Sequence, residues 1–177
     1  MKRTVRDALG EMKTQNGVSL VDLGRDQPVM LAFLRHFGCI FCMEAMRDIA
    51  EHRAEIEGRH VKICLVHMAE PEVAEGYFRD YNLLNIDHVS DIDCKYYEEF
   101  GLIKGNFNQL FGLQVWLRTA KLAYKDFSAL KRRQIGDGLQ MPGVFVIHDG
   151  EVVERYIHRK ASDRPDYREM TACCSPS

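Results

Sequence analysis

Two cysteines, Cys39 and Cys42, stand three positions apart in the stretch RHFGCIFCMEAM. The almost wholly apolar run 29–35 before them is typical of a strand buried on both faces, and apolar residues recur at helical spacing after Gly38. Cys39 is therefore expected where a strand gives way to a helix. A thiol there faces unpaired helical N–H groups and the positive end of the helix dipole, and both favour the nucleophilic thiolate.

The positions of the two cysteines predict different roles. Cys42 follows one helical turn after Cys39 on nearly the same face, so the two can close a disulfide. Because Cys42 lies deeper, Cys39 is expected to attack a partner and Cys42 to resolve the mixed disulfide. Arg35 and His36 directly precede the pair. A positive charge on either stabilises the thiolate, and His36 is also a candidate proton relay.

Two other interpretations of the pair stay open. The cysteines can be small hydrophobes in a core, or half of a zinc site that needs two further ligands. Cys173 and Cys174 are adjacent and remote, and the sequence has no second CxxC. They are auxiliary candidates that could pass electrons to a Cys39–Cys42 disulfide or resolve it, one thiol at a time, because adjacent cysteines form a ring only with difficulty. The alternative is an exposed tail without a role.

A second signal is Pro142 in MPGVFVIHDG, directly before an apolar strand pattern. A proline there cannot donate to a sheet ladder, and its peptide bond can be cis. A cis bond would leave the N–H and carbonyl groups of Met141 free to pair with an extended substrate segment. The alternative is an ordinary trans proline at the start of a strand.

Apolar periodicity and turn residues predict the elements that position these groups. The order indicates an α/β fold with a mixed sheet and helices on both faces. We expect one domain over residues 1–177, with a core of about 19–167, an N-terminal helical extension at 1–17 and a polar C-terminal tail at 160–177. Strands are expected at 18–23, 29–35, 61–68 and 88–93, helices at 5–12, 40–58, 71–81 and 96–102, at least one helix within 104–140, and a hairpin at 143–158 around Asp149-Gly150.

Composition excludes several classes of protein. The 177 residues are 46% hydrophobic and 28% charged with a net charge of −2, as in a soluble globular protein. A pI near 6.4 gives no reason to expect nucleic acid as a partner. No apolar stretch is long enough for a membrane span, so a cytoplasmic protein without a structural disulfide framework is expected. The basic run 118–133 is expected to be a solvated helix face; the alternative is a surface that docks an acidic redox partner or a membrane. Trp116 is expected in the core or in a dimer patch.

Three stretches carry a resemblance: LAFLRHFGCIFCMEAM, YYEEFGLIKGNFNQLF and GDGLQMPGVFVIHDGEVVERYIHRKASDRPDY. Their order resembles the AhpC/TSA-like, peroxiredoxin-like-2 (SelU-like) family of the thioredoxin-like superfamily. The resemblance implies a thioredoxin-like fold with a helical insertion before the C-terminal hairpin. It also implies Cys39 and Cys42 as the redox pair, Pro142 as a cis-proline, and neither metal nor organic cofactor.

The chain departs from related patterns at three positions. Typical peroxiredoxins carry Pro and Thr where this chain has Ala32 and His36, which argues against a fast peroxidase. Thioredoxins place a buried Asp at the position of Phe33. An internal carboxylate base is therefore not supplied in the usual way.

The function expected from these features is that of a thiol–disulfide oxidoreductase, or peroxiredoxin-like antioxidant, using the CxxC pair. Its partners would be a protein or small-molecule thiol or disulfide and an external thiol reductant such as thioredoxin or glutathione. One alternative is a thiol-dependent peroxidase in which Cys39 is oxidised by a hydroperoxide. An alternative of another class is a non-catalytic redox-sensing interaction module. A homodimer is a candidate assembly.

Overall fold

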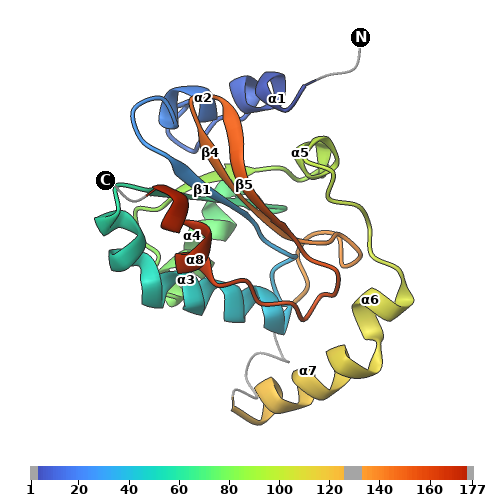
Figure 1. Cartoon of the computed structure of the whole chain (residues 1–177). Coiled ribbons are helices and arrows are strands. Elements are labelled where there is room, and N and C mark those ends of the chain that lie inside the picture. Colours follow the sequence, from blue (N-terminus) through green and yellow to red (C-terminus); the bar gives the residue numbers. More distant parts are fainter. Residues whose placement is uncertain (1–3, 126–132, 175–177) are drawn as a thin grey trace.

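The computed structural model describes residues 4–125 and 133–174. Its centre is a mixed five-stranded sheet in the order β3-β2-β1-β4-β5 (Figure 1). Strands β1, β2 and β3 run parallel, while β4 is antiparallel to both β1 and β5. The predicted α/β class and mixed sheet are confirmed. The strands are β1 (Val29–Phe33), β2 (Lys62–His67), β3 (Asp87–Ser90), β4 (Gly143–His148) and β5 (Glu151–Ile157).

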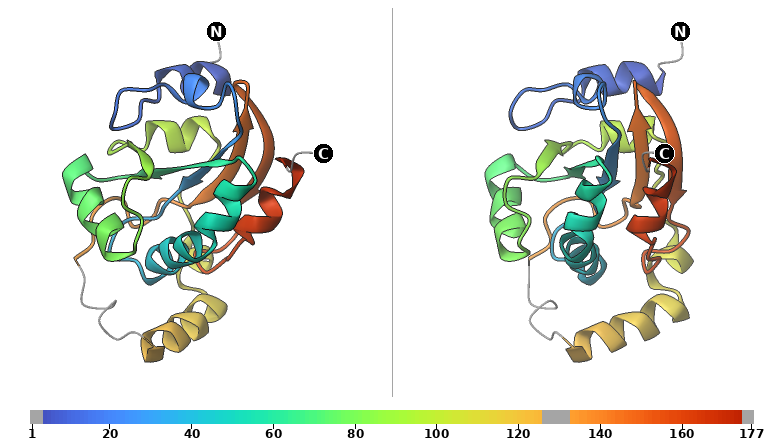
Figure 2. Two further views of the ribbon diagram at one scale, coloured as in Figure 1. Left: turned by 90° about the vertical axis from the view of Figure 1, so that its left-hand side faces the viewer. Right: turned by 60° about the vertical axis from the view of Figure 1, so that its left-hand side comes forward.

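Helices cover both faces of this sheet (Figures 1 and 2). Helices α3, α4 and α8 pack on one face, and α1, α2 and α5 pack on the other. Helices α6 and α7 are the expected helical insertion before the β4–β5 hairpin. The helices are α1 (Val5–Glu11), α2 (Leu20–Leu23), α3 (Ile40–Gly58), α4 (Pro71–Asp80), α5 (Lys95–Glu99), α6 (Phe107–Phe111), α7 (Leu113–Lys125) and α8 (Tyr167–Met170), followed by the 3-10 turn η2 (Ala172–Cys174).

Strand β1 is buried along its whole length, as its apolar run predicts. Met30 and Ala32 enter the cluster under α3, whereas Leu31 and Phe33 enter the cluster under α1 and α5. Successive strand residues point to opposite faces, so a strand covered on both sides must be apolar throughout.

The end of β1 is fixed by the buried Tyr97 of α5. Its hydroxyl lies 2.6 Å from the carbonyl oxygen of Leu34 and 3.1 Å from that of Val66. Helix α5 is itself begun by the carboxylate of Asp91, which accepts backbone N–H bonds from its first turn. This network holds the point from which the chain leaves the sheet toward Arg35 and the cysteines.

The strand expected over 18–23 is wrong, because residues Leu20–Leu23 form helix α2. The side chain of Ser19 accepts a hydrogen bond from the backbone N–H of Asp22 at 3.1 Å. This N-cap begins a helical turn and outweighs the β-propensity of the two valines nearby.

The segment expected as a polar tail is partly ordered against the core. Tyr167 and Met170 of α8 are buried on α3, and Arg59 at the end of α3 donates to the hydroxyl of Thr171 at 3.3 Å. The two apolar side chains, three residues apart on one helical face, are enough to dock a mainly polar stretch. Among the described residues, no helix combines the length and the apolar character that crossing a bilayer requires.

Candidate functional site

Cys39 lies at the junction of β1 and α3, as the sequence predicts. It is the N-cap of α3, and its carbonyl oxygen accepts the backbone N–H of Met43 at 3.1 Å. The thiol sulfur is not used as a helix cap, since its contact is with Arg35 Nη1 at 3.2 Å. The nucleophile candidate therefore sits at the positive end of a helix and beside a guanidinium.

Gly38 shapes the turn that carries Cys39. Its φ is +91°, and a Cβ at this position would stand 2.6 Å from the carbonyl oxygen of Arg133. Phe37 and Ile135 exchange two backbone hydrogen bonds of 3.0 Å beside it. Only glycine combines this left-handed backbone with such a close approach, so the turn locks the N-terminus of α3 against segment 133–138.

Arg35 is buried and held in place by two contacts. Besides the sulfur of Cys39, its guanidinium donates through Nη2 to the carbonyl oxygen of Gly138. Within the described residues, its Nε has no hydrogen-bond partner. A fixed positive charge against a sulfur stabilises the negative form of the thiol.

His36 does not supply that charge. Burial lowers the pKa of His36, and Arg35 lowers it further, although the Phe37 carbonyl and Asp137 act in the opposite direction. Its Nδ1 lies 3.1 Å from the carbonyl oxygen of Phe37. The histidine is therefore mainly neutral at pH 7, and the structure places Arg35, not His36, against the sulfur of Cys39.

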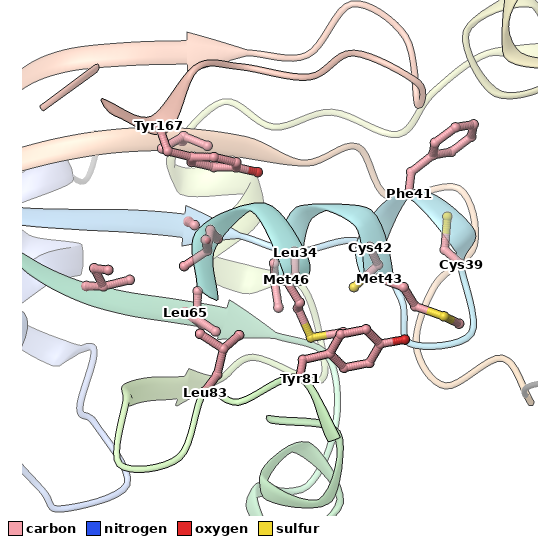
Figure 3. Packing of buried hydrophobic residues seen from close by; sticks show 14 of the residues in the cluster. Leu34, Cys39, Phe41, Cys42, Met43, Met46, Leu65, Tyr81, Leu83 and Tyr167 are labelled. Carbon is pink, nitrogen blue, oxygen red and sulfur yellow. The ribbon is translucent and has the colours of Figure 1, made fainter. Parts of the chain in front are cut away.

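Cys42 is the deeper of the two cysteines, as expected. It is 2% exposed, and burial raises the pKa of its thiol well above the usual range, with a further rise from Cys39 and a smaller lowering from Arg35. Both cysteines are free thiols, and Figure 3 shows their sulfur atoms pointing away from each other. A bond between them therefore needs at least one side chain to turn.

The expectation of a cis-proline is wrong, because the Met141–Pro142 peptide bond is trans. The backbone of Met141 is not free either. Its N–H donates to the carbonyl oxygen of Ile103 at 3.3 Å, and its carbonyl oxygen accepts Gln140 Nε2 at 3.3 Å. The segment at Ile103 takes the N–H of Met141 and the side chain of Gln140 takes its carbonyl oxygen, so neither group is left for a substrate.

A pocket opens beside the deeper cysteine. Its wall includes Cys42 and Arg35 together with Pro142, so the proline shares this pocket with the deeper cysteine. Two ion pairs stand on the α3 side of the pocket. Glu44 binds Arg118 of α7 at 2.7 Å, and Asp48 binds Arg164 through both carboxylate oxygens. The other lining side chains include Phe41, Ala45, Val144, His158, Ala161 and Tyr167.

His158 is the pocket residue that sequence reasoning missed. It is 8% exposed, its Nδ1 has no hydrogen-bond partner among the described residues, and burial lowers the pKa of its ring to about 4. It is neutral at pH 7. The DG turn pairs His148 with Glu151, but a register shift at Val146/Ile147 sets Gly143 opposite Ile157, one residue further than a regular hairpin would, and His158 follows directly. Nothing in the sequence signals this bulge.

The C-terminal cysteines are not brought to the pair. Cys174 packs against the core, and its N–H donates to the carbonyl oxygen of Thr171, which lies beside Arg59. Arg59 ends α3 whereas Cys39 begins it, and a helix of 19 residues spans about 28 Å. The side chain of Cys173 lies outside the described residues. An electron-transfer role for Cys174 would need the C-terminal segment to leave its place.

Metal ligation was one of the open interpretations of the cysteines. In the described ranges 4–125 and 133–174, no group of three or more His, Cys, Asp or Glu side chains is arranged to hold a metal ion.

Most of the chain matches one protein family and several characterised relatives. The model of the AhpC/TSA family matches residues 4–156. A prostamide/prostaglandin F synthase of Danio rerio is 23% identical over 167 residues, covering 91% of this chain and 82% of the relative. The chloroplastic thioredoxin-like protein AAED1 of Arabidopsis thaliana is 25% identical over 174 residues, covering 90% of this chain and 67% of the relative.

Solved structures agree at the level of the fold. The peroxidoxin BcpB of Mycobacterium tuberculosis superposes with a TM-score of 0.62 at 14% identity, covering 92% of this chain and 89% of that one. The bacterioferritin comigratory protein of Xanthomonas campestris gives 0.60 at 15% identity, covering 88% and 85%. These similarities show that the thioredoxin-like fold expected from the sequence is present.

Proposed function

The chain belongs to the AhpC/TSA family, and from that premise we propose that it is a thiol–disulfide oxidoreductase in which Cys39 attacks and Cys42 resolves. The family and its structural relatives support a redox function of the peroxiredoxin or thioredoxin type. The single observation that carries the finer proposal is the 3.2 Å contact between Arg35 Nη1 and the sulfur of Cys39 at the start of α3. We also propose the SelU-like subfamily and a cytoplasmic location.

In the first step the Cys39 thiolate attacks one sulfur of a substrate disulfide. A new S–S bond joins Cys39 to that sulfur, the substrate S–S bond breaks, and the other substrate sulfur leaves as a thiolate. Arg35 stabilises the attacking sulfur while it carries negative charge. Cys39 is itself buried, with 8% of its surface exposed, so only a small part of it is open to a substrate.

In the second step the Cys42 sulfur attacks the sulfur of Cys39. A Cys39–Cys42 bond forms, and the bound substrate sulfur leaves, taking up the proton that Cys42 gives up. The substrate has then gained two electrons and one proton from the cysteine pair, and the thiolate released in the first step takes its proton from water. Because burial raises the pKa of Cys42, this step is expected to be the slower one. An external thiol reductant returns the pair to the dithiol.

The first experiment compares single cysteine variants in a disulfide-reduction assay with an excess of dithiothreitol. Cys39→Ser is expected to abolish turnover, whereas Cys42→Ser, incubated with the substrate disulfide in the absence of dithiothreitol, should accumulate a mixed disulfide that mass spectrometry detects. The matched control is Cys64→Ser, since Cys64 is a buried thiol of β2 in the other hydrophobic cluster. Equal activity of all three variants and the parent would support the non-catalytic interaction module instead.

A second candidate function is favoured by the same contact. The Cys39 thiolate can attack a hydroperoxide, forming a sulfenic acid and releasing an alcohol, after which Cys42 condenses with it and water leaves. The name of the Danio rerio relative gives prostamide or prostaglandin F as its product, so an oxygenated lipid is a candidate substrate. Stopped-flow measurement of peroxide consumption decides between the two functions. A rate close to that of a free thiol would rule against the peroxidase.

A further inference from the structure

Helices α6 and α7 form an arm with an exposed apolar face, and we call this face the α6–α7 face. Each of its large side chains is between 54% and 76% exposed. A patch of this kind on a small domain normally marks an interaction site. The members of the face are Phe107, Phe111, Leu113, Trp116 and Leu117. The sequence predicts Trp116 in the core or in a dimer patch; the core is wrong, because the side chain is 64% exposed.

Two groups of side chains, one on each helix, make up the face. Leu113, Trp116 and Leu117 follow the i, i+3, i+4 spacing of one helical side, and the rings of Phe107 and Phe111 lie 5.6 Å apart. The opposite side of the arm holds it to the body through Leu110 and Val115, which are buried in the core. Figures 1 and 2 show α7 lying along the end of the molecule away from the N-terminus.

The charged side chains that α6 and α7 themselves carry are all basic. Residues 101–125 contain no Asp or Glu. Arg118 and Lys104 are paired with Glu44 and Asp137. Lys121 is exposed on α7, and Lys160 reaches α7 by contacting the side-chain oxygen of Gln114. Within the described residues, no acidic side chain pairs with Lys121 or with the ammonium group of Lys160. Aromatic and aliphatic side chains flanked by such lysines are typical of helices that lie in a membrane interface.

We propose that the α6–α7 face docks on the surface of an anionic phospholipid bilayer. Phe107, Trp116 and Leu117 enter the boundary of the acyl chains, while lysines contact the lipid phosphates. Charge favours this occupant over a second copy of the chain. A symmetric pair would place like-charged lysines against each other without an acidic partner on the arm, whereas anionic lipids complement them.

Docking would set the position of the cysteines relative to the bilayer. The Glu44–Arg118 ion pair ties α7 to the first turns of α3, whose N-cap is Cys39. The N-terminus of α3 would then lie close to the lipid surface. The docking proposal does not depend on the proposed redox function, since binding and thiol chemistry are measured separately.

The test uses the chain's single tryptophan, Trp116, as the probe. The full-length protein is mixed with vesicles of phosphatidylcholine alone or with phosphatidylserine added. Anionic vesicles are expected to shift the tryptophan emission to shorter wavelength and to sediment the protein. Neutral vesicles and high salt should weaken this binding at least tenfold.

Variants identify the face in the sedimentation assay. The double variant Phe107→Ser/Leu117→Ser is expected to lose at least tenfold in vesicle affinity, whereas Val153→Ser is its control, since Val153 is 50% exposed on β5. Lys121→Glu should weaken binding to anionic vesicles at least tenfold, because it replaces an attracted positive charge with a repelled negative one. Lys13→Glu, an exposed lysine outside the arm, is the matched control.

Three results would overturn the proposal. The first is no binding to anionic vesicles, and the second is equal binding of the face variants and their controls. The third is an emission shift that appears with rising protein concentration, without lipid and with a doubled mass in sedimentation, which would assign the face to a second copy. Circular dichroism of each variant checks that it folds. The variants are expected to keep their disulfide-reduction activity, so a failure of the docking proposal can be told apart from a failure of the proposed redox function.

Discussion

At the scale of single residues, the environment of sulfur separates Cys39 from the other buried cysteines. Cys39 has a guanidinium at 3.2 Å. Burial raises the pKa of Cys64 well above its usual range and that of Cys94 to about 11, and burial acts in the same direction on Cys42. These three thiols stay protonated at neutral pH, so the chemistry of the chain concentrates on Cys39.

Replacing Arg35 tests whether its positive charge makes Cys39 more reactive than the other buried thiols. Arg35→Met keeps the length of the side chain and removes its charge, and a hydrogen bond to a charged group contributes about 1.5–3 kcal/mol. We expect iodoacetamide to alkylate Cys39 at least tenfold more slowly at pH 7, with partial recovery in Arg35→Lys. Arg53→Met, on the surface of α3 where Arg53 pairs with Glu57, is the control. Equal alkylation rates in Arg35→Met and the parent would contradict the role of Arg35.

At the scale of elements, the turn before α3 positions both cysteines. Gly38→Ala forces a side chain into a backbone with φ +91° and against the carbonyl of Arg133. We expect it to lower the free energy of unfolding by about 1–3 kcal/mol. We also expect slower alkylation of Cys39, because a displaced turn breaks the contact between Arg35 and the sulfur of Cys39. Urea denaturation and alkylation kinetics measure the two effects.

Gly10→Ala is the matched control for this prediction. Gly10 lies within α1, and a Cβ there meets nothing within 4 Å. Alanine in a helix is expected to leave stability unchanged or to raise it by up to about 1 kcal/mol. A loss of stability in Gly10→Ala as large as that in Gly38→Ala would contradict the account of the turn.

Several of these elements could be predicted from the sequence, whereas parts of the site could not. Strands β1 and β2, helix α3 and the β4–β5 hairpin follow from local patterns of apolar residues and turn residues. The trans Pro142 and the paired backbone of Met141 depend on the distant segment at Ile103. The position of His158 depends on a bulge. Such contacts between remote segments leave no local signature, which explains why these features of the site were missed.

At the scale of the whole molecule, buried histidines link stability to pH. His67 is fully buried with its Nε2 2.9 Å from Nδ1 of His88, and burial lowers its pKa to about 3. Burial lowers the pKa of His158 to about 4. Both values lie below the ordinary 6.5 of an unfolded histidine. Their contribution to stability is therefore complete above pH 6.5 and is lost as pH falls toward the folded values.

Urea denaturation between pH 7.5 and 5 measures this loss in the free energy of unfolding. Most carboxylates titrate below this pH range, so they contribute little to the slope. Below pH 6.5 the free energy of unfolding is expected to fall by up to about 1.4 kcal/mol per pH unit for each buried histidine. His67→Gln should flatten the slope, whereas His148→Gln should leave it unchanged, since His148 is exposed. A slope that is the same in the parent and in His67→Gln would contradict the assignment.

The most direct test of the central claim is to map the sulfur bonds formed under mild oxidation. The native protein is treated with less than one equivalent of diamide, the remaining thiols are blocked, and the peptides are identified by mass spectrometry. We expect Cys39 and Cys42 to bond first, with the loss of two hydrogens. If Cys39 stays reduced while Cys64 or Cys94 is oxidised, or bonds first to Cys173 or Cys174, the claim is contradicted.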